Sequence, residues 1–109
     1  MAYVVHNFKE VEKVMKKEKD FTQELVFYLN DFIIKNYNDF PKDIKEEIHP
    51  DYLVWMCGKI LENLDIWPVH KAHRWIGYIQ GVLITLDIST VSEQKEETRK
   101  ILNRYDLNF

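Results

Sequence analysis

The chain has 109 residues, a length that suits one domain with a hydrophobic core of its own. It carries a formal net charge of -3, which argues against a general nucleic-acid-binding protein. It has a single cysteine, Cys57, and no apolar stretch long enough to cross a membrane, so we expect a cytoplasmic protein with no membrane partner.

Two helices are predicted in the first third of the chain. Asn7 and Glu10 form a capping-box pattern, so the first helix should begin after Asn7 and end in the charged run KKEKD. Asp20 and Gln23 repeat the pattern, which predicts a second helix over residues 21–36. The apolar residues of the second helix recur at helical spacing: Phe21, Leu25, Val26, Leu29, Phe32 and Ile33.

Prolines mark the starts of the next three predicted helices. Pro41 stands at the first position of a short, exposed helix with the sequence PKDIKEEI. Pro50 opens a longer helix that should run to about Leu64, and Pro68 opens another. Gly58 costs its helix about 1 kcal/mol in propensity, so we expect it to mark a close crossing with another helix.

The last third of the chain predicts two amphipathic helices. The helix after Pro68 has one apolar face, formed by Ala72, Ile76, Ile79, Leu83 and Leu86. The final helix should begin at Ser89 or Thr90, because Thr90 and Glu93 form a capping box. Its expected anchors are Val91, Leu102 and Tyr105. No segment alternates with period two, so the predicted fold is all-α, a compact single-domain bundle of five or six helices spanning residues 1–109.

The stretch HKAHRWIGYIQG, residues 70–81, is unusual in its charge. No acid stands between Asp65 and Asp87, and Lys71 and Arg74 give this interval a charge of +2. The rest of the chain holds 13 cations and 18 acids, a balance of -5. Cations in the first turns of a helix are unfavourable by about 0.3–1 kcal/mol each, so their presence there indicates an anion site.

We therefore expect a ligand-binding site for a phosphate-bearing molecule on this helix. Lys71 and Arg74 would hold phosphate, with His70 and His73 as further donors. Trp75 or Tyr78 would stack on a base, and Gln80 would read a base edge. Gly77 and Gly81 leave backbone open for packing against another helix or at an interface.

A purely structural interpretation of the same residues stays open. Lys71 and Arg74 could pair with acids from residues 42–47 or 93–97, while Trp75 joins the core. His70 and His73 have a spacing compatible with a metal ligand pair, but no third ligand stands out, so we expect no metal. Cys57 lies on an apolar helix face and is expected to be a small buried hydrophobe.

The segment RWIGYIQGVL, residues 74–83, resembles a segment of small uncharacterised accessory proteins of tailed bacteriophages. In those proteins an Arg-Trp pair, a Gly, an aromatic residue and a Gln-Gly recur before an apolar run. No activity and no functional residue can be transferred from the resemblance. The resemblance implies only a general function in the cytoplasm of the bacterial host. That function would be inhibition of a host enzyme, or sequestration of a nucleotide signal of antiviral defence.

These observations predict a small phage-type accessory protein that is not an enzyme and uses no cofactor. It would bind and sequester a nucleotide or cyclic nucleotide, because no catalytic motif accompanies the expected anion site. The alternative is a protein–protein interaction module that inhibits or redirects a host protein. A weaker third hypothesis is an enzyme built around His70, His73 or Cys57. The nearly all-apolar run Val82–Leu86 favours a homo-oligomer.

Overall fold

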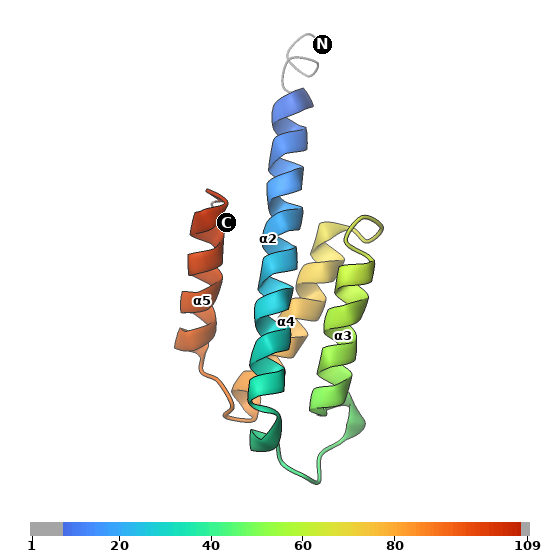
Figure 1. The fold of residues 1–109 in the computed structure, drawn as a ribbon, viewed down its shortest axis with the longest axis vertical. Coiled ribbons are helices and arrows are strands. Elements are labelled where there is room, and N and C mark those ends of the chain that lie inside the picture. The colour runs from blue at the N-terminus through green and yellow to red at the C-terminus, as the bar shows by residue number, and fades with distance from the viewer. Residues whose placement is uncertain (1–7, 108–109) are drawn as a thin grey trace.

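The computed structural model describes residues 8–107, which form an all-α domain without a strand in that range (Figure 1). Its four α-helices are α2 (Phe8–Lys35), α3 (Pro50–Glu62), α4 (Val69–Thr85) and α5 (Val91–Arg104). Two 3-10 turns, η1 (Tyr37–Asp39) and η2 (Glu46–Ile48), lie between α2 and α3. The all-α class is confirmed, but the expected five or six helices are four α-helices and two short turns.

The first two predicted helices are one continuous helix, α2, of 28 residues. The predicted break in the charged run at residues 16–20 is therefore wrong. Lys, Glu and Asp do not interrupt a helix as Gly or Pro would, and neither breaker occurs between residues 8 and 35. The cap expected at Asp20 is an ordinary position inside the helix, and the cap expected at Asn7 lies outside the described residues.

The helix expected to begin at Pro41 is also absent. Only Glu46–Ile48 form a single 3-10 turn, and Lys45 before it is extended, with φ -63° and ψ 149°. A segment of eight residues cannot offset the cost of helix nucleation through local hydrogen bonds alone. Ile44 and Ile48 instead pack against the core and hold the connection between α2 and α3 on the bundle.

The boundaries of α3 and α4 follow the prolines closely. Pro50 is the first residue of α3, where the His49 ring accepts a hydrogen bond from the Asp51 amide. Pro68 is the N-cap of α4. Gly58, however, marks no close helix crossing, because a Cβ added there would meet no atom within 4 Å.

A tight turn joins α4 to α5 and sets the angle between them. The Asp87 amide donates to the Ile84 carbonyl and the Ile88 amide to the Leu83 carbonyl, the two bonds of a Schellman motif. Asp87 takes the left-handed conformation, with φ 58°, that glycine usually supplies. Thr90 then caps α5, and the predicted capping box with Glu93 is confirmed.

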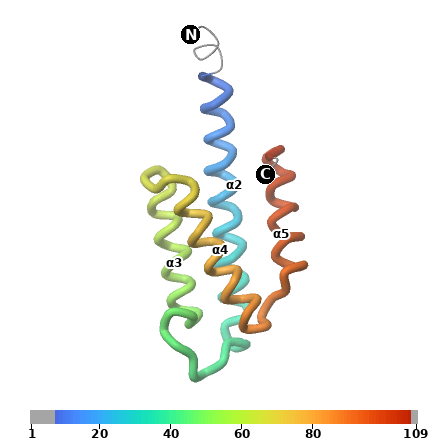
Figure 2. Tube along the Cα trace, turned by 180° about the vertical axis from the view of Figure 1, so that it is seen from behind, coloured from blue at the N-terminus to red at the C-terminus, as the bar shows by residue number. Residues whose placement is uncertain are grey.

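The hydrophobic core joins α2, α3 and α4. It contains Leu25, Val26, Leu29 and Ile33 of α2, Leu53, Met56, Cys57 and Ile60 of α3, and Ala72, Ile76, Ile79, Val82 and Leu83 of α4. Seen from behind, α3 and α5 lie on opposite sides of α4 (Figure 2). Helix α5 packs mainly against α2 through the buried Ile101, while the predicted anchor Val91 is exposed. A groove lined by residues of both helices remains between α5 and α4.

Candidate functional site

Residues 70–81 form the predicted helix, and its turns distribute the expected site residues over different faces of α4. The core face carries Ala72, Ile76, Ile79 and Leu83, all buried as expected. The remaining residues of the stretch point outward, toward α3 or toward α5. Because successive helical residues are rotated by about 100°, a run of twelve residues cannot converge on one ligand.

The outward face of α4 carries His70, Arg74, Gly77 and Gly81. Both His70 and Arg74 are exposed, and Arg74 has no ion-pair partner within residues 8–107. A Cβ added at Gly77 or Gly81 would meet no atom within 4 Å. Neither glycine therefore packs against another helix of the same chain, and this face is open.

The face toward α3 carries an aromatic cluster. Trp75 lies between two other indoles, with ring centroids 4.7 Å from Trp67 and 6.1 Å from Trp55. The Lys71 ammonium lies 4.1 Å from the Trp67 ring centroid, in a cation–π contact. The Tyr78 hydroxyl donates a 2.6 Å hydrogen bond to the Glu47 carbonyl. Lys71, Trp75 and Tyr78 thus already have partners within the fold.

The face toward α2 and α5 carries His73 and Gln80. The His73 ring nitrogen Nε2 lies 3.1 Å from the hydroxyl of Thr22, and that hydroxyl donates to the Glu18 carbonyl. Since the single hydroxyl hydrogen is used there, the imidazole is the donor to Thr22. The ring also meets Phe21 edge-on, with centroids 6.1 Å apart. Burial lowers the pKa of His73, and the nearby Glu18 carboxylate opposes this effect.

We expect His73 to make the protein less stable in mild acid. Its pKa in the folded state lies below the usual 6.5, so as pH falls through 6.5 the unfolded chain binds a proton that the folded chain does not. The free energy of unfolding should therefore fall from pH 7 until the lower pKa is passed. Urea unfolding at several pH values measures this effect. His73→Gln should lose this dependence of the unfolding free energy on pH, and the exposed-site control His70→Gln should keep it. Equal pH profiles for the wild type and both variants would refute the assignment of the effect to His73.

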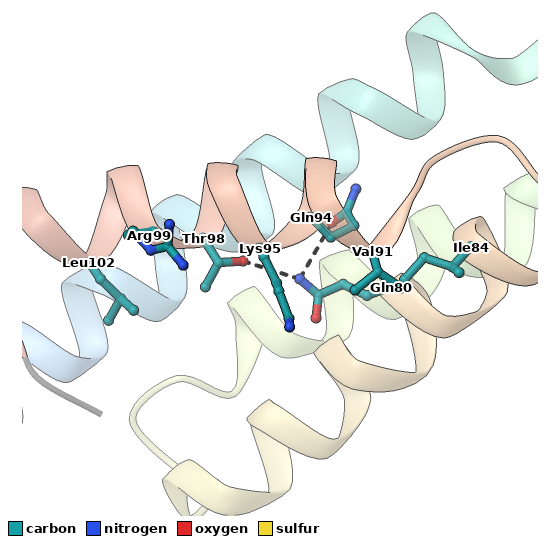
Figure 3. A pocket seen from close by; sticks show the side chains of 8 residues that line it. All are labelled: Gln80, Ile84, Val91, Gln94, Lys95, Thr98, Arg99 and Leu102. Atoms are coloured by element: carbon teal, nitrogen blue, oxygen red, sulfur yellow. Dashed lines mark hydrogen bonds between the residues drawn. The ribbon is translucent and has the colours of Figure 1, made fainter.

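An open groove between α4 and α5 has a volume of about 480 Å³, within the roughly 300–1,000 Å³ of small-molecule sites. It is lined by Gln80, Ile84, Val91, Gln94, Lys95, Thr98, Arg99 and Leu102 (Figure 3). A second cavity of about 300 Å³ shares Gln80, Thr98 and Leu102 with it. That cavity extends toward His73 and α2, so two of the predicted ligand-binding residues, His73 and Gln80, line this region.

Amide groups form the polar centre of the groove. The Gln80 side-chain amide nitrogen donates to the side-chain oxygen Oε1 of Gln94 and to the hydroxyl of Thr98, both at 3.4 Å (Figure 3). Gln94 is buried and donates from its amide nitrogen to the Ser89 hydroxyl at 2.9 Å. This short network holds the Gln94 amide in one orientation. The Gln80 bonds are long, so its amide can turn toward a bound group at little cost.

The groove is positively charged although the protein is acidic. Lys95 and Arg99 line it, and neither has an ion-pair partner within residues 8–107. No carboxylate belongs to the described lining. The neighbouring cations of α5 are engaged, since Lys100 pairs with Glu96 and Glu97 and Arg104 pairs with Glu24. These two free cations beside fixed amides can attract and orient an anion.

Lys95 and Arg99 were not among the predicted site residues. They stand in the run SEQKEETRK, whose mixed charges look like an ordinary solvated helix face. Their spacing of four residues was the available signal, because it places them on one side of α5 with Val91 and Leu102. Which acids turn away from that side depends on packing that the local sequence does not specify.

The described residues show no metal cluster, and their one cysteine is not activated. No group of three or more His, Cys, Asp or Glu side chains gathers within residues 8–107. Cys57 is buried in the core as predicted, and burial raises the pKa of its thiol to about 12. At neutral pH this thiol is protonated and therefore a poor nucleophile.

Comparison of the chain with protein-family models, with curated proteins and with solved structures finds no match. Within the described part of the chain, none of the helices has both the length and the apolar character that a membrane span requires.

Proposed function

We propose that the groove between α4 and α5 binds a phosphate-bearing small molecule, such as a nucleotide or a cyclic nucleotide signal, without converting it. The observation that supports this most strongly is the pair of free cations, Lys95 and Arg99, on a lining without carboxylates. An anion placed there gains two charge-assisted interactions and displaces no internal ion pair. The same two cations would repel a basic or strongly cationic ligand.

Each part of the lining has a distinct role in the proposal. The planar Arg99 guanidinium can bind two phosphate oxygens at once, while the Lys95 ammonium adds a mobile point charge. The Gln80 amide, which can turn, offers both a donor and an acceptor, the groups needed for the edge of a base. Ile84, Val91 and Leu102 form an apolar wall for its faces.

Sequestration fits this groove better than catalysis does. Its described lining contains no cysteine, histidine, aspartate or glutamate, the usual nucleophiles and general acids or bases. A binder of this kind lowers the free concentration of its ligand. The resemblance of residues 74–83 to phage accessory proteins adds a setting, in which the ligand would be a nucleotide signal of host defence.

A thermal-shift screen against mono-, di- and cyclic nucleotides tests the proposal. A ligand at 100 times its dissociation constant adds about 2.7 kcal/mol, which raises the midpoint of a domain this size by on the order of 10 °C. Arg99→Ala should weaken binding about 10- to 100-fold, because it removes a charge-assisted contact. Binding should also weaken as salt is added.

Arg74→Ala is the matched control, since it removes the same charge from an exposed site on the outward face of α4, outside the groove lining. It should bind with wild-type affinity. A ligand whose binding is lost in Arg74→Ala and kept in Arg99→Ala would move the site back to the outward face of α4. A screen with no shift for any nucleotide would contradict small-molecule sequestration by this groove.

A second candidate function, inhibition of a host protein, is favoured by the shape of the groove. Its lining follows α5 from Val91 to Leu102, about three helical turns, with the cations Lys95 and Arg99 between these two apolar ends. Such a surface would suit an acidic amphipathic helix of a partner. A stoichiometric partner captured from bacterial lysate by the wild type, and not by a Lys95→Glu/Arg99→Glu variant, would support this function over the first.

A further inference from the structure

The N-terminal part of α2 extends beyond the rest of the bundle. Residues 8–18, here called the arm, project past the ends of the other three helices in both views (Figures 1 and 2). The ion pair between Lys19 and Asp65 marks the level at which the turn between α3 and α4 meets α2. Above that level the arm rises for roughly 15 Å.

The arm is apolar along one side, although no other element of the described chain covers that side. Its exposed apolar residues are Phe8 (61% exposed), Val11 (52%), Val14 (47%) and Met15 (62%). Phe8, Val11 and Met15 are three and four residues apart, and the same spacing continues down α2 to the buried Thr22, Leu25 and Leu29. The stripe is therefore the core-facing side of α2, continued past the point where the core ends.

The end of the bundle beneath the arm adds two exposed apolar residues. Ile66, in the turn between α3 and α4, is 74% exposed, and Val69, at the start of α4, is 43% exposed. Together with the arm they expose on the order of 600 Å² of apolar surface. That is the upper end of what a monomer shows, and it approaches the roughly 800 Å² per partner of a stable interface.

We infer that this surface, the arm with the adjoining bundle end, pairs with the same surface of a second copy of the chain. The arm supplies a ridge and the bundle end supplies the floor beside it, so the surface is self-complementary, as a two-fold interface requires. Residues 8–20 carry five lysines and four acids, so two arms come together with almost no net repulsion.

The direction of pairing follows from where the stripe faces. The stripe overhangs its own bundle, so a second copy with a parallel arm would need the space that α4 and α5 already fill. Antiparallel arms avoid this clash, and each brings its Phe8 toward Ile66 of the partner copy. The arm lies apart from the α4–α5 groove, so this inference does not depend on the proposed ligand.

Sedimentation velocity and light scattering of the full chain, at concentrations up to a few hundred micromolar, test the pairing. The wild type should reach twice the chain mass of 13.2 kDa. Val11→Glu/Met15→Glu places two charges in each copy of the interface and should weaken dimerisation at least 100-fold. Both sites are exposed in the single chain, so circular dichroism should show the same helix content.

Phe27→Glu/Ile34→Glu is the control, because it puts two such charges at exposed apolar positions of α2 away from the arm. It should dimerise like the wild type. A wild type that stays monomeric throughout this range would overturn the inference. An arm variant that associates as strongly as the wild type would also overturn it, since another surface would then be responsible.

Discussion

Leu29→Ala should destabilise the protein by about 2–5 kcal/mol, the usual cost of emptying a leucine site in a close-packed core. Leu29 is fully buried at the middle of α2, the helix that packs against α3, α4 and α5 alike. A domain of this size has a total stability of about 5–15 kcal/mol, so the loss is a large fraction of it. Urea unfolding followed by circular dichroism measures the difference as a lower midpoint.

Ile34→Ala provides the comparison for this prediction. Ile34 lies on the same helix but is exposed, so its truncation should change the free energy of unfolding by less than about 0.5 kcal/mol. A similar loss for both variants would mean that the core does not lie on the side of α2 described above.

Trp75→Ala should cost about 3 kcal/mol of stability. Its indole packs between Trp55 and Trp67, so truncation leaves a gap in the aromatic cluster and removes contacts on two sides. The sequence suggested instead that Trp75 could stack on a base, and in that case its loss would affect binding and leave stability nearly unchanged. Chemical unfolding together with nucleotide titration separates these two roles.

Trp55→Ala is the matched control in the same cluster. Trp55 is half exposed and lies at the outer side of Trp75, stacked on Tyr52. Trp55→Ala should therefore lower the free energy of unfolding by clearly less than Trp75→Ala does. If the two variants unfold at the same urea concentration, Trp75 is not the centre of the cluster.

Local signals predicted those parts of the fold that local chemistry determines. Three helix starts were predicted to within one residue of their observed positions, from Pro50, from Pro68 and from the capping box at Thr90. The same kind of signal failed at Asp20, because no Gly or Pro interrupts the helix before it and α2 continues through the charged run. The turn after α4 lacked the glycine that usually signals a helix end, because Asp87 takes the left-handed conformation there.

The candidate site was harder to predict, because it depends on which helix faces meet. The contiguous run of residues 70–81 was predicted to form one site. In the helix, however, Lys71 and Trp75 lie toward α3, and His73 and Gln80 lie toward α5. The cations that do line the groove, Lys95 and Arg99, come from a different helix. Their proximity to Gln80 is a consequence of tertiary packing.

The most direct test of the binding site is a two-dimensional amide NMR titration. The probes are the nucleotide with the largest thermal shift and, for the anion site alone, inorganic phosphate. Binding in the α4–α5 groove predicts saturable shifts of the Gln80 and Gln94 side-chain amides and of the backbone amides of Lys95, Thr98 and Arg99. Shifts confined to residues 69–75, or no saturable shift with either probe, would contradict it.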